Sequence, residues 1–198
     1  MKSKNNLIKF INNNSYFIDN RYVIIKPFSK KNLTKEFLNA LNNKEINKYL
    51  TFQRQTKKTL LKYYNKRIKK KELYYAIINK KPIKFIGTFT VRCNRKIFPQ
   101  RYKYTIGNVV FIKKYWGSKS SKISFKVLLD FIFNVLNLKR IYAVTFQQNV
   151  SANFNLISNN FKIINKKNNL FNFLLTKKNY KKENNKDYNY VIKNADLR

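Results

Sequence analysis

Two periodicities of apolar residues alternate along this chain and predict its order of secondary structure. Runs rich in β-branched and aromatic residues predict strands, and apolar residues spaced three or four positions apart predict helices. The predicted strands span residues 22–27, 74–78, 83–91, 104–112, 140–146, 169–175 and 187–192. The predicted helices span residues 33–49, 56–70, 120–136 and 151–159. This order mixes hairpins with βαβ crossovers, which predicts an α/β sheet with helices on both faces.

The length of 198 residues suits one domain, and an apolar content of 43% is enough for a sizeable core. Residues 1–20 are rich in Asn and Lys and are expected to form a flexible leader, with the domain at residues 21–198. No apolar stretch is long enough to span a membrane, and the one near the N-terminus is too short for a signal peptide. A lone cysteine, Cys93, fits a reducing compartment, so we expect a cytoplasmic protein.

The residues that are scarce exclude several kinds of active site. The chain has no His, so it cannot build a Ser-His-Asp triad or a histidine metal site. One Cys cannot form a disulfide framework or a cysteine zinc site. Only 8 carboxylates are present, and Mg²⁺ and Ca²⁺ need clustered oxygen ligands, so we expect no metal.

The net charge of +36 allows two interpretations. A polyanion such as RNA would bind such a chain by its phosphates. The amino-acid composition instead favours a bias that comes from an AT-rich genome. Lys, Asn, Ile, Phe and Tyr, all with AT-rich codons, are abundant, and Arg is scarce. Lysine pairs are also spread along the chain rather than gathered in one block. Nucleic acid is therefore a partner that the sequence permits but does not favour.

The most informative segment runs from residue 106 to residue 121. A buried strand enters a tight turn at Gly117, and a helix follows directly. The free amides and the positive dipole end of a helix N-terminus bind phosphate well. Ser118, Ser120 and Ser121 can cap this helix or bond to an anion, and Lys113, Lys114 and Lys119 add charge. The alternative is an ordinary strand-turn-helix unit with a serine cap.

The wider context of this segment resembles the GNAT family of N-acetyltransferases, and most of all its branch with ribosomal-protein N-terminal and amino-sugar acetyltransferases. The residues in register with that family are Gly107, Tyr115-Trp116-Gly117, Leu128-Leu129-Asp130-Phe131, Leu138 to Ala143, Asn149 and Phe161. Three strands fit as well: Arg21 to Pro27 resembles the family's opening strand, Phe85 to Thr88 its third, and Asp187 to Tyr190 its last.

The resemblance implies a single GNAT-like α/β (α+β) domain. Its mixed, mostly antiparallel sheet would have about seven strands, splayed between the fourth and the fifth. Acetyl-CoA would be the co-substrate, with its pyrophosphate on the turn and its pantetheine arm along the fourth strand. The implied binding residues are Val110, Phe111, Ile112, Lys114, Trp116, Gly117, Ser118, Lys119, Ser120 and Asn149. For the side chain of Trp116, packing under the turn is preferred over stacking on an adenine or on the acceptor.

The sequence departs from the family pattern where catalytic groups are often found. Leu156 occupies the position of a general-acid Tyr, and Thr105 replaces a carboxylate near Gly107. No catalytic residue is therefore identified. Asn160 replaces a Gly, and Asn tolerates the left-handed turn best among other residues. Tyr64 and Tyr75 are candidates for lining an acceptor pocket, although core packing is the preferred interpretation.

Three hypotheses follow for function. The first is an N-acetyltransferase that moves an acetyl group to a primary amine, in a protein N-terminus or an amino sugar, by direct attack on the thioester. The second is an inactive basic module of the same fold, bound to RNA or the ribosome. The third is a small-molecule acetyltransferase for antibiotics or the cell envelope. We expect a monomer or homodimer that does not bind membranes.

Overall fold

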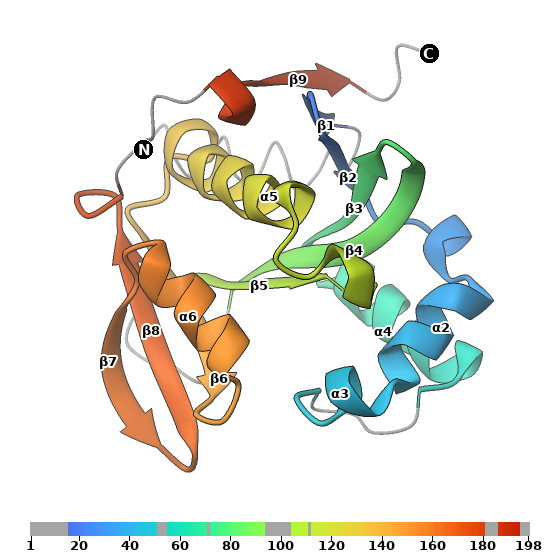
Figure 1. Ribbon diagram of the computed structural model, residues 1–198, viewed down its shortest axis with the longest axis horizontal. Coiled ribbons are helices and arrows are strands. Elements are labelled where there is room, and N and C mark those ends of the chain that lie inside the picture. Colours follow the sequence, from blue (N-terminus) through green and yellow to red (C-terminus); the bar gives the residue numbers. More distant parts are fainter. Residues whose placement is uncertain are drawn as a thin grey trace.

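The computed structural model describes residues 16–50, 55–70, 72–93, 104–110, 112–180 and 186–194 (Figure 1). The strands are β1 (Tyr16–Asn20), β2 (Val23–Pro27), β3 (Leu73–Lys80), β4 (Ile83–Cys93), β5 (Tyr104–Val110), β6 (Arg140–Phe146), β7 (Lys162–Lys167), β8 (Leu170–Thr176) and β9 (Tyr190–Asn194). The helices are α2 (Lys35–Asn42), α3 (Lys44–Asn47), α4 (Lys57–Lys69), α5 (Lys119–Asp130) and α6 (Val150–Ser158). Short 3-10 turns span Lys30–Asn32, Lys113–Tyr115 and Lys186–Tyr188, and a π-helical turn, Phe131–Val135, extends α5.

The described strands form one sheet in the order β7-β8-β6-β5-β4-β3-β2-β1-β9. Every neighbouring pair is antiparallel except β5 and β6, which α5 connects in parallel. The predicted mixed, mostly antiparallel α/β sheet is confirmed, but it has nine strands rather than about seven.

The two strands that the sequence did not predict, β1 and β7, both lack a clear strand pattern. All six residues of β7 are exposed, so no buried face imposes a period of two on its sequence. Residues 16–20 were assigned to the flexible leader, yet they form β1, which lies between β2 and β9. Residues 1–15 of that leader lie outside the described residues.

Strand β9 lies at the opposite edge of the sheet from β7 and β8, the two strands that precede it in the sequence. Asp187 belongs to a 3-10 turn rather than to the predicted strand, and β9 begins only at Tyr190. β9 pairs with β1 at one edge of the sheet, whereas β7 and β8 form the opposite edge.

β5 and β6 share only one described pair, Thr105 opposite Tyr142. Beyond it β5 runs on to Val110 and β6 to Phe146 without further pairing. Because the strands are parallel, they separate toward their carboxyl ends. This split matches the predicted splay between the fourth and fifth strands of the family, and it divides the sheet into β6-β8-β7 and the remaining six strands.

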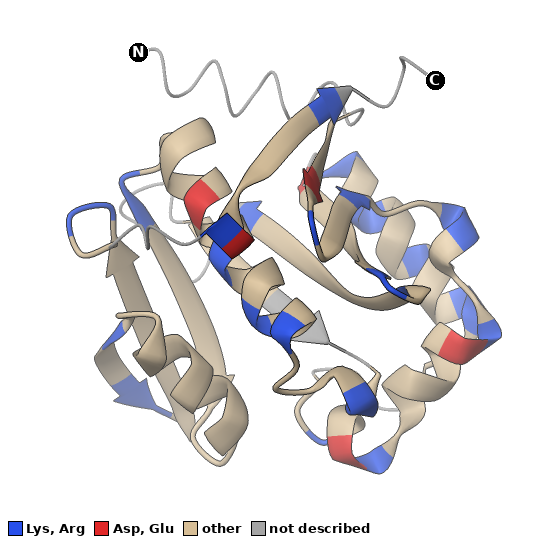
Figure 2. Cartoon of the chain, turned by 45° about the horizontal axis from the view of Figure 1, so that its top comes forward, with Lys and Arg blue, Asp and Glu red and all other residues tan. Residues whose placement is uncertain are grey.

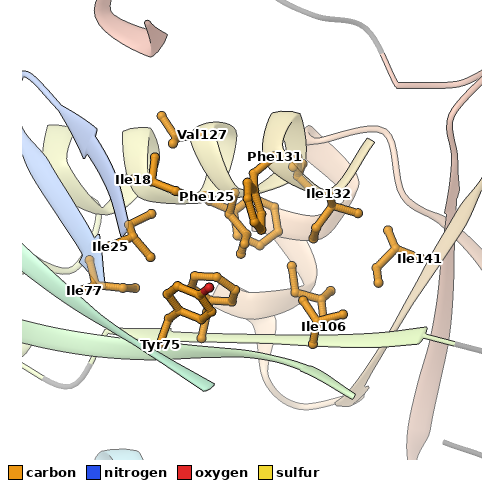
Figure 3. Close-up of a cluster of buried hydrophobic side chains, with 14 of the residues drawn as sticks. Ile18, Ile25, Tyr75, Ile77, Ile106, Phe125, Val127, Phe131, Ile132 and Ile141 are labelled. Atoms are coloured by element: carbon orange, nitrogen blue, oxygen red, sulfur yellow. The ribbon is translucent and has the colours of Figure 1, made fainter. Parts of the chain in front are cut away.

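One face of the sheet is covered by α5 and α6, and the buried residues there form what we call the α5-side core (Figures 1 and 3). Phe125, Phe131 and Ile132 pack over both parts of the sheet. The strand residues below them include Ile25, Ile77, Phe89, Ile106, Ile141 and Phe173. Helix α5 is therefore buried along most of its length, and it bridges the split.

The opposite face carries a smaller set of buried residues, which we call the α4-side core. Its members are Phe28, Phe37, Leu41, Ile46, Leu60, Tyr74, Ala76 and Ile78. Residues 74, 76 and 78 of β3 point to this side and Leu73, Tyr75 and Ile77 to the other, as the period of two requires. Helices therefore cover both faces, as predicted.

Polar residues set the ends of several helices. The helix predicted over residues 33–49 is divided in two because Asn43 ends α2 and caps α3, accepting a hydrogen bond from the amide of Glu45 at 3.0 Å. Thr56 caps α4, as its position predicted, through the amide of Thr59 at 3.1 Å. Asn160 follows α6 with φ of 64°, the left-handed conformation expected of it. Among the described residues no helix has the length and apolar character needed to cross a membrane.

The α5-side core generates a test of stability. Leu128 on α5 is 0% exposed, whereas Leu61 on α4 is 37% exposed. Leu128→Ala should lower the free energy of unfolding by about 2–5 kcal/mol, because it leaves a cavity in a core that holds the two parts of the sheet together. Leu61→Ala is the matched control and should change it by about 0.5 kcal/mol or less. Urea denaturation measures both, and equal losses would contradict the assignment.

Candidate functional site

The turn between β5 and α5 is held from below by Tyr115, which is 8% exposed and belongs to the α5-side core. Gly117 has φ of +68°, and a Cβ added there would meet no atom within 4 Å. The glycine is therefore required by the backbone conformation and not by crowding. This leaves open space beside the turn at the start of α5.

Ser118 caps α5, because its hydroxyl accepts a hydrogen bond from the amide of Ser121 at 3.3 Å. The amides of Gly117, Lys119 and Ser120 have no acceptor among the described residues. Unpaired amides at the positive end of a helix dipole, next to open space, suit a phosphate group. The residues present therefore fit the pyrophosphate of a nucleotide such as CoA.

The side chain of Ser120 is not free to bind an anion in this arrangement. Its hydroxyl donates to Oδ1 of Asn79, at the end of β3, at 2.6 Å. Asn79 is itself buried and donates to the carbonyl of Pro82 at 2.8 Å. Ser120 thus fastens the first turn of α5 to the β3–β4 hairpin, and its contribution to an anion site is limited to its amide.

The three lysines of the turn differ in what they contact. Nζ of Lys113 lies 2.9 Å from Oε1 of Glu45, and Nζ of Lys119 lies 2.7 Å from Oδ2 of Asp187. The hydrogen bond to Asp187 raises the pKa of Lys119, so this ammonium group stays charged. Nζ of Lys114 lies 5.3 Å from the centroid of the Tyr115 ring. The wider positive charge is spread over many elements (Figure 2).

Trp116 is 41% exposed, whereas its neighbour Tyr115 is buried. The predicted packing under the turn is therefore made by Tyr115, and the indole of Trp116 lies at the surface beside Gly117. In sequence this indole lies next to the amides of Gly117 and Lys119, which have no acceptor among the described residues.

The split between β5 and β6 lies beside this turn in sequence, since β5 leads directly into it. Val110 ends β5, and Ile112 follows with its amide 3.5 Å from the carbonyl of Ile86. Phe111 lies outside the described residues. Across the split, Asn149 caps α6 by accepting a hydrogen bond from the amide of Ala152 at 3.3 Å. Asn149 therefore has a structural role as a helix cap, and its contact with the pantetheine arm stays a prediction.

The structure does not bring Tyr64 and Tyr75 together. Tyr75 is 1% exposed in the α5-side core and stacks on Phe89, with ring centroids 5.0 Å apart. Burial raises its pKa well above the ordinary value, so the phenol stays protonated. Tyr64 is half-buried on the other face, and its ring centroid lies 6.0 Å from that of Phe28. The core-packing interpretation is thus the one that the burial of Tyr75 favours.

A polar strand face that the sequence reasoning missed lies on the α4 side of the split. Thr90 and Arg92 of β4 are paired with Gly107 and Thr105 of β5. The alternate residues Phe89, Val91 and Ile106 belong to the α5-side core. We call Thr90, Arg92 and Thr105 the polar strand face. Its signal in the sequence is a polar residue at every second position of β4, from Thr88 to Arg92.

Each acidic residue in the described part of the chain has a structural partner. Asp19, Glu36, Glu45, Glu72 and Asp187 form ion pairs with lysines or Arg67. Asp130 is buried and accepts hydrogen bonds from Asn134, Tyr180 and Tyr190. Leu156, at the family's tyrosine position, is buried in the core. No carboxylate among these residues stands ready as a general base.

The sequence of residues 23–153, from β2 to the start of α6, matches the family model of the acetyltransferase (GNAT) domain. This chain belongs to the GNAT family. Membership makes it a transferase of acyl groups and accounts for the split beside an amide-rich turn. No curated protein matches the sequence significantly.

Solved structures share the fold of this GNAT chain. A GNAT acetyltransferase from Bacillus anthracis has a TM-score of 0.68 at 16% identity, covering 82% of this chain and 99% of its own. Spermidine N-acetyltransferase from Vibrio cholerae, in complex with CoA and spermine, has a TM-score of 0.65 at 18% identity, with coverages of 80% and 97%. FdhC, a nucleotide-linked sugar GNAT, has a TM-score of 0.63 at 14% identity, with coverages of 82% and 90%.

The conformation of Gly117 generates a second test. Gly117→Ala should lower the free energy of unfolding by about 1–2 kcal/mol, because a Cβ opposes the left-handed conformation although no atom crowds it. Gly117→Asn is the control and should cost less, since Asn adopts this conformation more readily. Urea denaturation distinguishes the two, and equal stability of all three proteins would show that the turn does not need positive φ.

Proposed function

We propose that this protein transfers the acetyl group of acetyl-CoA to a primary amine of a protein N-terminus, an amino sugar or another small molecule. The observation that carries the proposal is the turn at Gly117, where amides with no acceptor among the described residues begin a helix beside a split sheet. The amides of Gly117, Lys119 and Ser120 would hold the pyrophosphate, and Lys114 and Trp116 would flank it. Val110 to Ile112 and Asn149 would border the pantetheine arm in the split.

The proposed reaction is a direct transfer without a covalent enzyme intermediate. The neutral amine attacks the thioester carbon, a C–N bond forms, and the C–S bond breaks. The sulfur leaves as a thiolate and takes up the proton that the amine loses, so the products are an amide and CoA. Backbone amides at the split are the groups available to stabilise the oxyanion.

The absence of an identified base is compatible with this chemistry. A free α-amine has a pKa of about 8, so a substantial minority of it is neutral at pH 7. A net charge of +36 further favours the neutral amine, because like charges disfavour the cation. The same charge opposes binding of polyamines and lysine-rich peptides. Acceptors whose amine accompanies a neutral or anionic group are therefore preferred.

Binding of CoA is the first test of the proposal. Isothermal calorimetry should detect CoA binding, and Lys114→Met should weaken it about three- to fivefold, as expected for an exposed ion pair worth up to about 1 kcal/mol. Lys58→Met, an exposed lysine on α4, removes the same charge and should leave the affinity unchanged. No detectable binding at millimolar CoA would refute the proposal.

The pH dependence of transfer is the second test. If the acceptor loses its proton without a protein base, kcat/KM should rise tenfold per pH unit up to the pKa of the acceptor amine and then level off. Two acceptors with different amine pKa values should give profiles displaced by the same difference. A rate profile whose midpoint stays constant when the acceptor is changed would reveal a titrating group of the protein instead.

A further inference from the structure

The polar strand face of Thr90, Arg92 and Thr105 surrounds the one glycine of β5. A Cβ built on Gly107 would lie 3.2 Å from Oγ1 of Thr90 and 3.9 Å from Nη2 of Arg92. Thr105 lies two residues before Gly107, on the same face of the strand, and is paired with Arg92. A hydroxyl and a guanidinium group therefore meet over a position that has no side chain.

Two polar groups of this face are buried without a hydrogen-bond partner in the described part of the chain. They are Oγ1 of Thr105, a residue that is 6% exposed, and Nε of Arg92. The ion pairs formed by the described residues do not include Arg92. Leaving a charged donor unpaired is costly, and none of the described residues supplies its acceptor, so an anionic ligand that did so would stabilise this arrangement.

An arginine at position 92 is unusual for this sequence, in which most positively charged residues are lysines. The chain uses 36 Lys and only 8 Arg, so its default cation is lysine. Arginine presents a planar fork of donors that matches the two oxygens of a carboxylate or phosphate, which a lysine ammonium does not. Arg67, by comparison, is paired with Glu72.

The location of this face connects it to the split. Thr105 forms with Tyr142 the single described pair between β5 and β6, so the strands separate directly after it. The face lies on the α4 side of the sheet, whereas α5 covers the opposite side. A molecule that reaches the split from the α4 side would meet Arg92 beside Gly107.

We propose that Arg92, together with Thr90 and Thr105, binds an anionic group of the acceptor, a carboxylate or a phosphate that lies a few bonds from the amine. This inference rests on the proposed acetyl transfer and names its substrate class as anionic amines. Arg92 would hold the anion with its fork, and the buried hydroxyl of Thr105 would donate a further hydrogen bond.

Matched acceptors test this specificity and separate its two sources. L-Alanine against L-alaninamide probes a carboxylate, and glucosamine 6-phosphate against glucosamine probes a phosphate, with rates expressed per neutral amine. The anionic member of one pair should have at least about a tenfold higher kcat/KM, as one charge-assisted hydrogen bond can supply. Equal rates within both pairs would overturn the inference while leaving acetyl transfer intact.

Variants then test whether the preference for anionic acceptors depends on Arg92. Arg92→Met should abolish it, Arg92→Lys should retain part of it, and Thr105→Val should reduce it a few-fold, all without changing the KM for acetyl-CoA. Arg140→Met is the matched control, because Arg140 is exposed at the start of β6, and it should keep the full preference. A preference that survives in Arg92→Met contradicts the assignment.

Binding gives an answer that does not depend on turnover. Each anionic acceptor is titrated calorimetrically into the protein with CoA present, or without it if CoA does not bind. At least one should bind, about tenfold more weakly to Arg92→Met than to the Arg140→Met control. If the protein does not bind CoA but binds an anionic acceptor through Arg92, the proposed acetyl transfer is refuted and the anion site at Arg92 is retained. No binding of either anion, or binding that ignores Arg92, would overturn the inference.

Discussion

Among the described residues, a single strand pair, Thr105 opposite Tyr142, joins the two parts of the sheet, and the remaining architecture compensates for this weak connection. A parallel pair needs a long crossover, and α5 provides it. The same helix supplies the buried side chains that pack over both parts, so the hydrophobic core maintains a continuity that the backbone hydrogen bonds do not. A hydrogen bond also connects the two parts of the molecule. The hydroxyl of Tyr49, which follows α3, donates to the carbonyl of Gln148, just past the end of β6, at 3.1 Å. The sheet can thus stay open at the split, which is where the proposed function places the substrates.

Ion pairs of the described carboxylates also hold separate elements of the fold together. The described carboxylates are used to connect elements: Asp19 binds Lys80 and Lys193 between strands, and Asp187 binds Lys119 beside the turn. Burial opposes ionisation of Asp19, but the hydrogen bonds from both lysines still hold its pKa below the ordinary value. Because the described acids are engaged in this way, the proposed transfer relies on backbone amides, on positive potential and on the acidity of the acceptor itself.

Sequence patterns located the elements whose burial is strong and local. The β-branched run before Gly117 indicated β5, and the apolar periodicity between residues 120 and 136 indicated α5, whose buried face follows that periodicity. Gly117 and Asn160 were also predictable, since positive φ restricts which residues fit. β7 could not be found this way, because every one of its residues is exposed. β1 lay hidden in an Asn-rich stretch, and its partners, β2 and β9, include one strand from the other end of the chain.

Contacts between distant segments explain what the sequence could not reveal about the site. Ser120 looks like an anion ligand in its local setting, yet Asn79, 41 residues away, takes its hydroxyl. Arg92 looks like an ordinary strand residue until pairing with β5 places it beside Thr105 and Gly107. A polar residue on an alternating strand normally faces solvent. Here the same alternation places polar groups of β4 beside Gly107 and Thr105 of β5, the strand that borders the split, so the pattern carries a different meaning once the neighbour of that strand is known.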